Sequence, residues 1–168
     1  MKLIDNLLLR DLQQRAVASP RKRMNHNLHE IQVDPVQRML NAFEPATYVR
    51  PHRHSGEDRW ELFLLLQGSL ALLTFADSGE VLSRVDLSMD GPVRGVELPG
   101  NTWHTLVSLA PNSVIFEVKR GPYIANTEAD FAQWAPRESA ANSEGAASCE
   151  KFVTWYRSAQ PGDMPPAM

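Results

Sequence analysis

The residues with the clearest chemical potential are two histidines in the segment PHRHSGEDRWELFLLLQGS, residues 51–69. Side chains alternate between the two faces of a β-strand, so His52 and His54 would project side by side from one face. Two imidazoles in this arrangement can bind one metal ion without bending the backbone. A single histidine would not distinguish a ligand from an ordinary core or surface residue. The paired spacing favours a metal chelate.

Two further residues could complete the coordination of a metal ion. Glu61 places a carboxylate within an otherwise apolar segment, where burial without a partner would be costly and a cation would offset that cost. The alternative for Glu61 is an edge strand on which it faces water. His104 follows a Pro-Gly turn and opens another apolar segment, so it could approach from a neighbouring strand. Three imidazoles and one carboxylate suit Fe, Mn, Co, Ni or Zn, and we predict one divalent transition metal ion of open identity.

Other charged or polar side chains near these residues are candidates for substrate binding. Arg50 lies two residues before His52 and would share its face in a regular strand, where it could hold a carboxylate or phosphate. Alternatively, Pro51 breaks the register and sends Arg50 to solvent. Lys119 and Tyr123 close the last apolar segment and are also candidate substrate-binding residues.

The segment at residues 20–35, PRKRMNHNLHEIQVDP, is polar and is expected to be an irregular loop, and it supplies two further candidates. His29 could act as an acid or base near neutral pH, and Asn27 could bind substrate, if both lean over a cavity. The alternative for both is that they cap local backbone groups. The basic run at residues 21–23 could be a solvated turn or an anion-contacting edge of a site.

The pattern of the whole chain indicates the elements that must position these residues. Asp5 can cap a helix that runs to about Val17, and Ser19-Pro20 marks its end. Short apolar segments then alternate with turn signals, which predicts an antiparallel barrel or sandwich over about residues 36–120. The expected fold class is therefore all-β, with an N-terminal helix.

The C-terminal part of the chain has a different character. We predict a single domain over residues 1–136, followed by a linker and tail over residues 137–168 that is partly helical or flexible. The segment EKFVTWYRS could form a short helix. Cys149 is the only cysteine, which excludes an intrachain disulfide and is compatible with a reducing compartment. We interpret this thiol as incidental because its small neighbours do not indicate a structured site.

Composition limits the classes of partner. The chain has 168 residues, of which 43% are hydrophobic and 22% charged, values typical of one globular domain. Its net charge of -3 gives no basic field for nucleic acid. The N-terminus has no signal-peptide pattern, and no apolar run is long enough to span a bilayer. We therefore expect a cytoplasmic protein that binds a small molecule, with no nucleic acid or membrane partner.

The spacing PHRH(x6)E(x6)G, with PGNTWH downstream, resembles the two signature motifs of the cupin superfamily. This resemblance implies a cupin barrel, that is, a double-stranded β-helix or jelly roll, with His52, His54, Glu61 and His104 as metal ligands. The usual motif has three or four residues between the second histidine and the glutamate, whereas six separate His54 from Glu61, so Glu57 and Asp58 remain alternatives. Glu61 is preferred because six residues separate it from Gly68, as the motif requires.

A narrower resemblance covers roughly residues 1–136. The chain is similar to the WbuC family of small cupin-fold metalloproteins in the segments NLHE, DPVQRMLNAFEP, TYVRPHRH, WELFLLLQGSLALL, PGNTWHTLV and FEVKRGPY. The resemblance implies a link to bacterial surface-polysaccharide biosynthesis, and cupin barrels in general imply a homodimer.

Two classes of function follow from these observations. The first is a metal-dependent enzyme, an isomerase or epimerase or else a dioxygenase, acting on a small polar or sugar-derived substrate. The second is a non-catalytic module that binds a metal ion or a small ligand. An open metal face lined by Arg50, Lys119 or His29 would favour the enzyme. A closed site would favour the module.

Overall fold

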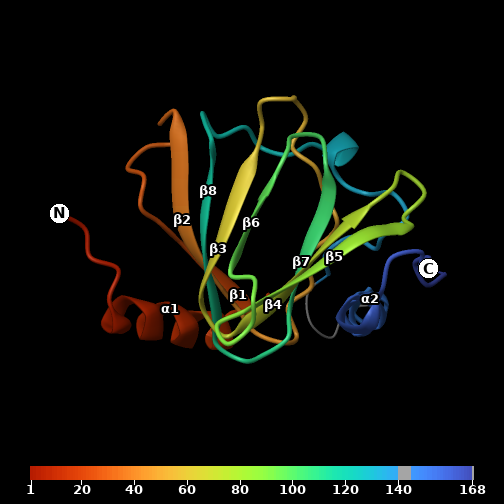
Figure 1. Ribbon diagram of the computed structural model, residues 1–168, viewed down its shortest axis with the longest axis horizontal. Helices are drawn as coiled ribbons and strands as arrows, with labels where there is room; N and C mark the ends of the chain where they lie inside the picture. Colours follow the sequence, from red (N-terminus) through yellow and green to blue (C-terminus); the bar gives the residue numbers. More distant parts are fainter. Residues whose placement is uncertain (140–144, 168) are drawn as a thin grey trace.

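The computed structural model describes residues 1–139 and 145–167, and over these residues two antiparallel sheets pack face to face with a helix outside each (Figure 1). The elements are α1 (Asn6–Ala18), β1 (Arg23–Asn27), β2 (Val36–Phe43), β3 (Glu61–Gln67), β4 (Ser69–Phe75), β5 (Val81–Ser88), β6 (Gly95–Leu98), β7 (Trp103–Ser108), β8 (Ser113–Arg120), the 3₁₀ turn η1 (Glu128–Asp130) and α2 (Ala146–Ser158).

The order of the strands defines a jelly roll. The larger sheet has the order β1-β2-β8-β3-β6, and the smaller has the order β5-β4-β7. One edge of β7 pairs with β4, and its other edge pairs with His52 through the bridge to His104. The residues around His52 therefore act as a short fourth strand of the smaller sheet. Apart from the additional β1, each sheet then has four strands in the interleaved order of two Greek keys. The predicted jelly-roll barrel is confirmed, and β2 to β8 occupy the predicted range.

Helix α1 covers the outer face of the larger sheet. The Asp5 side chain accepts hydrogen bonds from the backbone N–H groups of Leu7 and Leu8 at 3.1 and 2.9 Å, so the predicted N-cap is confirmed. Leu12 and Ala16, one helical turn apart, are fully buried against residues of β2 and β8. This packing leaves the opposite face of the larger sheet for the barrel interior.

The inward-facing side chains change from polar to apolar along each strand near the site. In β3, the inward face begins with Glu61 and continues with Phe63 and Leu65. In β7, it begins with His104 and continues with Leu106. The apolar positions join one buried cluster that fills the interior. The polar positions therefore collect at one end of the barrel.

Helix α2 covers the outer face of the smaller sheet and is part of the same core. Phe152 and Tyr156 are fully buried, and they pack with Tyr48 and Phe75 from the barrel. The predicted short helix is therefore present, and it is docked on the barrel rather than detached as a tail. Residues 140–144, within the predicted linker, lie outside the described residues.

Two further expectations need correction. Cys149 is buried in α2, with Sγ 3.4 Å from the carbonyl oxygen of Arg137, so its surroundings are structured. The polar residues 23–27 form the edge strand β1, which pairs with β2, rather than an irregular loop.

Across residues 1–139 and 145–167, no helix is long and apolar enough to cross a membrane.

Candidate metal centre

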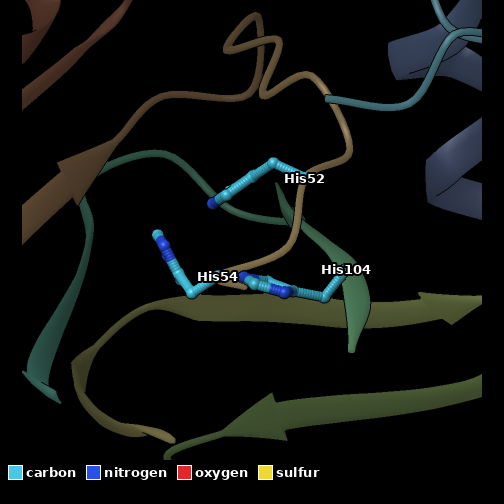
Figure 2. Close-up of side chains that lie close together, drawn as sticks. All are labelled: His52, His54 and His104. Atoms are coloured by element: carbon cyan, nitrogen blue, oxygen red, sulfur yellow. The ribbon is translucent and has the colours of Figure 1, made fainter. Parts of the chain in front are cut away.

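Three histidines converge at the polar end of the barrel. One nitrogen from each of His52, His54 and His104 lies within 4.8 Å of the others. Figure 2 shows these three side chains close together. The backbones of His52 and His104 exchange two hydrogen bonds, with N–H to oxygen separations of 3.0 and 2.9 Å. His54 follows two residues later on the same segment. The two segments thus bring the imidazoles together through ordinary antiparallel pairing.

The tautomers of two imidazoles are fixed by backbone carbonyls. The Nδ1 atom of His52 lies 3.0 Å from the Arg50 oxygen, and the Nδ1 atom of His104 lies 2.9 Å from the Thr102 oxygen. A carbonyl oxygen only accepts hydrogen bonds, so each Nδ1 must carry the proton. In the neutral form this leaves the Nε2 lone pair for a metal ion, an arrangement that is usual for ligating histidines.

Glu61 adds a carboxylate between two of the imidazoles. Its side chain is buried, with oxygens 3.0 Å from His54 Nε2 and 3.1 Å from His104 Nε2. By contrast, Glu57 and Asp58 are exposed, and Asp58 pairs with Arg120. The structure therefore places Glu61, rather than either alternative, beside the histidines.

The electrostatics of the cluster favour one buried ion pair. Burial opposes the charge on Glu61, but the hydrogen bond from His104 and its positive charge outweigh it and hold the Glu61 pKa well below its usual value. Burial likewise opposes charge on His104, but the hydrogen bond to Glu61 and its negative charge outweigh it, so the His104 pKa is raised. Burial, together with the positive His104, holds the His52 pKa well below its ordinary value. His52 is therefore neutral at physiological pH.

The residues fit a transition metal ion. The His54 Nε2 atom is buried and makes no directed hydrogen bond within the described structure, although the Glu61 carboxylate is near it. A buried imidazole nitrogen without a partner is unfavourable, and coordination would satisfy it. Three nitrogens and one carboxylate oxygen form a donor set used by several divalent first-row ions, so the set does not choose among them.

A second polar cluster adjoins the metal ligands. The Lys119 ammonium lies 3.2 Å from Glu61 and 2.8 Å from Glu117, and the Asn41 amide donates to Glu117 at 2.6 Å. Lys119 was predicted near the site, whereas Glu117 and Asn41 were missed. Glu117 could have been found because it lies two residues before Lys119 on one strand and so shares its face.

These side chains border a cavity of about 490 Å³, a size suited to a small molecule. The metal-ligand end is lined by His52, Glu61 and His104, with Lys119 beside them. Arg21 and Arg23 also line it, and the remaining lining residues are Ser19, Met24, Asn25, Met39, Asn41, Phe43, Val49, Phe63, Leu106 and Glu117. The polar centre is thus open to a ligand.

The prediction that Arg50 faces this cavity is wrong. The Arg50 side chain is buried, and it donates from Nε and a terminal nitrogen to the Ala132 carbonyl at 3.2 and 3.0 Å. Its other terminal nitrogen lies 3.3 Å from Glu128, and its guanidinium carbon lies 5.2 Å from the Phe131 ring centroid. Arg50 therefore anchors the segment 128–132 against the histidine segment.

Three other candidates also lie away from this cavity. His29 is buried, and its Nδ1 accepts a hydrogen bond of 3.1 Å from the backbone N–H of Arg38 in β2. Asn27 is exposed on the edge strand β1, where its side-chain oxygen accepts from Asn25. Tyr123 is half exposed and lines a separate cavity of about 80 Å³, which His54 and Lys119 also border. The capping alternative holds for His29.

The jelly-roll topology and the inward-facing histidines place the chain in the class of cupin-fold proteins with a candidate metal centre in the barrel. The chain belongs to the family described as "Domain of unknown function (DUF6016)", whose model matches residues 4–87, half of the chain. Comparison with curated proteins finds no match.

Several solved structures are similar to the chain. KdgF from Halomonas sp. is 19% identical, with 61% of this chain and 82% of KdgF covered and a TM-score of 0.44. A cupin superfamily protein from Desulfitobacterium hafniense DCB-2 is 18% identical, with 58% and 76% covered and a TM-score of 0.46. An RmlC-like cupin protein from Desulfovibrio desulfuricans is 13% identical, with 58% and 81% covered and a TM-score of 0.44.

Proposed function

We propose that the protein binds one divalent transition metal ion through the Nε2 atoms of His52, His54 and His104 and the carboxylate of Glu61. The observation that carries this proposal is the convergence of three imidazoles, His104 buried and the other two partly buried, with Nδ1 held by a backbone carbonyl in His52 and His104. Such backbone contacts fix the orientation of a ligating imidazole before the metal arrives.

We further propose that the protein is an enzyme acting on a small polar substrate. When bound, the ion would supply Lewis-acid polarisation of a substrate carbonyl or hydroxyl oxygen. Burial opposes the charge on Lys119, but the negative Glu117 and Glu61 outweigh it and raise the Lys119 pKa, so the side chain stays protonated. Lys119 would then donate a hydrogen bond to a substrate oxygen. Glu117, which is buried beside it, is the candidate proton acceptor.

The reaction class follows from these side chains. A proton acceptor beside a polarised oxygen suits isomerisation or epimerisation, and an oxygenase would require iron. The sequence resemblance to the WbuC family supports a sugar-derived substrate linked to surface-polysaccharide biosynthesis, in the cytoplasm. We also propose that the protein is a homodimer, which light scattering on the purified protein would test.

Elemental mass spectrometry on protein purified without a histidine tag tests the metal site. We expect near-stoichiometric metal in the wild-type protein and less than about a tenth of that amount after His52→Ala, because one of four ligands is lost. His26→Ala is the matched control, since His26 lies on β1 outside the cavity. Absence of metal from the wild-type protein would contradict the proposal, as would equal metal content in the His52 variant.

A further inference from the structure

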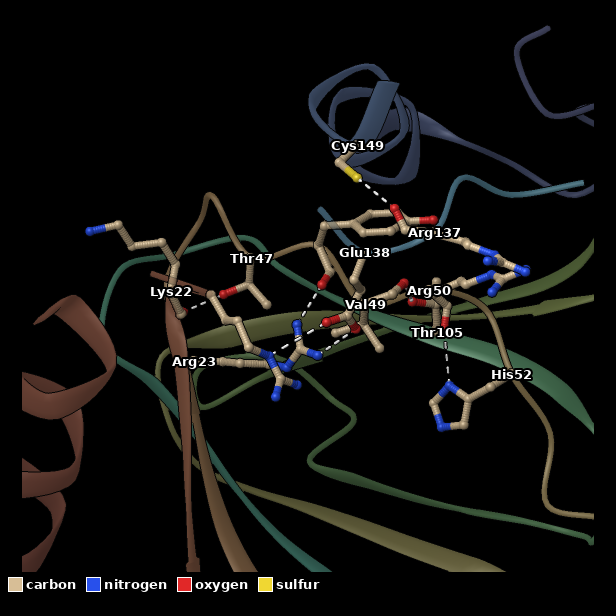
Figure 3. A network of polar contacts seen from close by, with 12 residues as sticks. Lys22, Arg23, Thr47, Val49, Arg50, His52, Thr105, Arg137, Glu138 and Cys149 are labelled. Carbon is tan, nitrogen blue, oxygen red and sulfur yellow. Dashed lines mark hydrogen bonds and ion pairs between the residues drawn. The ribbon is translucent and has the colours of Figure 1, made fainter. Parts of the chain in front are cut away.

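The cavity contains a second charged region besides the metal ligands, formed by Arg21 and Arg23. The Arg23 side chain is 15% exposed, and one terminal nitrogen donates to the Glu138 carboxylate at 2.5 Å (Figure 3). Its other terminal nitrogen donates to the Tyr48 carbonyl at 2.5 Å. Arg21 Nε lies 3.4 Å from the second oxygen of Glu138. Glu138 thus holds both guanidinium groups in place.

The holding contacts leave part of each guanidinium free for a ligand. Both arginines line the metal cavity, whereas Glu138 does not line it. An arginine has five N–H donors, and the contacts above use two on Arg23. Within the described part of the chain, Arg23 Nε and both terminal nitrogens of Arg21 make no hydrogen bond. These donors are the ones available to a ligand in the cavity.

We propose that Arg23, with Arg21 beside it, binds the oxyanion of a small acid whose other end reaches the metal centre. The ligand would carry a carboxylate or phosphate group at one end and a metal-binding oxygen at the other. The inference rests on the proposed metal site for the second contact only. It assigns to the basic run at residues 21–23 a role in substrate binding.

The spacing of the two regions suits a small molecule. Arg23 donates to the Tyr48 carbonyl, and His52 donates to the Arg50 carbonyl, while the intervening Val49 carbonyl accepts from Thr105 of β7 at 2.7 Å. Alternate carbonyls that accept from different partners are typical of an extended chain, in which residues two apart are separated by about 7 Å. The carbonyls that hold Arg23 and His52 thus belong to residues two apart on one segment.

The charges of the cavity also favour an anion. At the metal end, Glu61 and Glu117 are opposed by Lys119, and a divalent ion would leave this end with one positive charge in excess. At the other end, Arg21 and Arg23 share a single carboxylate partner among the described residues, Glu138. Apolar side chains such as Met39 and Phe63 lie along the cavity wall and would reduce the screening of an ionic contact. A neutral ligand would use neither excess charge.

Three matched sugars provide the probes, because they share a ring and differ in charge: glucose, glucuronate and glucose 6-phosphate. Their dissociation constants would be measured by ligand-observed NMR titration of the purified, metal-analysed protein. We expect at least one anionic sugar to bind about tenfold or more tightly than glucose, as is usual for charge-assisted contacts. Which anion binds more tightly distinguishes a carboxylate from a phosphate ligand. Equal affinity for all three sugars, or no binding of any, would overturn the inference.

Variants of the two arginines test whether these side chains cause the preference for an anionic sugar. Arg23→Gln should remove the preference for the anion without reducing metal content, and the amide can still donate to the Tyr48 carbonyl. Arg21→Gln should weaken the preference for the anion by a smaller factor. Because the Arg21 side chain is 65% exposed, this substitution should leave the fold intact. Arg38→Gln is the control, because Arg38 pairs with Asp34 away from this cavity. A preference that survives in Arg23→Gln would also overturn the inference.

Metal content separates this inference from the proposed function. If the wild-type protein bound no metal, the metal proposal would fail, and anion preference measured on the same metal-free protein would still decide the role of Arg23. If metal were present and the anion preference absent, only the assignment of the arginines would fail.

Discussion

At the scale of single residues, His104 and Glu61 make a contact that depends on protonation. His104 donates from Nδ1 to the Thr102 carbonyl, so a second proton on Nε2 would be shared with Glu61, 3.1 Å away. The negative Glu61 stabilises that proton and raises the pKa of His104, although burial opposes it. A metal ion bound at Nε2 must displace this proton. Metal binding and proton release are therefore coupled at this residue.

The pH dependence of metal affinity follows from that coupling. Below the raised pKa of His104 the metal-free protein holds the proton, so affinity should rise by about tenfold per pH unit for the one proton displaced. Above that pKa the increase should stop. His52, whose pKa burial and the positive His104 hold well below its ordinary value, should contribute no proton near neutrality. Zinc competition titrations between pH 5.5 and 8.5 would measure the affinity, and calorimetry in two buffers would count the protons released. Zinc affinity that does not change with pH would contradict the prediction.

The choice of carboxylate ligand is also a prediction at this scale. Glu61→Gln should reduce metal affinity by at least about tenfold, because the anionic ligand is lost while the side chain keeps its size. Glu57→Gln should leave affinity unchanged, since Glu57 is exposed and outside the histidine cluster. Parallel competition titrations of the two variants with a chromogenic chelator give the comparison. The reverse pattern would mean that the carboxylate assignment is wrong.

At the scale of elements, the histidine segment is held from two sides. β7 pairs with it through His104, and residues 128–132 pair with it through the hydrogen bond from the Ala132 N–H to the Pro51 carbonyl at 2.9 Å and the bridge between His52 and Phe131. The buried Arg50 side chain joins these two segments through the Ala132 carbonyl. Because the Arg50 carbonyl also holds His52, this contact positions a metal ligand.

Replacing Arg50 tests the role of this contact. Arg50→Met keeps the length of the side chain but leaves the Ala132 carbonyl without its partner, at a cost of about 1–3 kcal/mol in the free energy of unfolding. Metal affinity should also fall by roughly tenfold, as for other groups that orient ligands. Chemical denaturation and chelator competition measure the two effects, with Arg38→Met as the exposed control. Loss of stability with unchanged affinity would limit Arg50 to a structural role.

Helix α2 allows a prediction about the core. Phe152 of α2 is fully buried in the core that the helix forms with the smaller sheet. Its ring meets those of Tyr48 and Tyr156 edge-on, and its centroid lies 6.5 Å from the Tyr48 centroid and 5.9 Å from the Tyr156 centroid. Phe152→Ala should lower the free energy of unfolding by about 3–5 kcal/mol, through lost burial and a cavity. Thr154→Ala, at an exposed position of the same helix, should change it little. Urea denaturation of both variants would show whether α2 is an integral part of the fold.

The elements also show why only part of the site was predictable from sequence. The paired histidines follow from the alternation of side chains along strands, and Asp5 from local capping chemistry, so both depend on neighbouring residues alone. Glu61 was preferred over Glu57 and Asp58 because of its spacing to Gly68 in the cupin motif. The position of Arg50 depends on contacts with residues 128–132, about eighty positions away, which no local pattern records. β1 was missed because an edge strand of polar residues has no apolar alternation.

At the scale of the whole molecule, the candidate metal centre joins the two sheets. His104 belongs to β7 of the smaller sheet, and His52 and His54 lie on the segment paired with it, whereas Glu61 begins β3 of the larger sheet. The Lys119 contact to Glu61 extends this connection into β8. An ion bound here would therefore link the two halves of the barrel at its polar end.

This arrangement predicts that metal stabilises the whole fold rather than one loop. An ion that binds only the folded state should raise the free energy of unfolding by about 2.7 kcal/mol at a free concentration one hundred times its dissociation constant. Because the ligands come from both sheets, chelation should lower the midpoint of a single cooperative transition instead of producing a separate early one. Thermal denaturation of the wild-type protein with and without chelator measures this change, and His52→Ala should show no effect of chelator. A chelator-sensitive early transition, with the main midpoint unchanged, would instead confine the effect of the ion to the histidine segment and its neighbour β7.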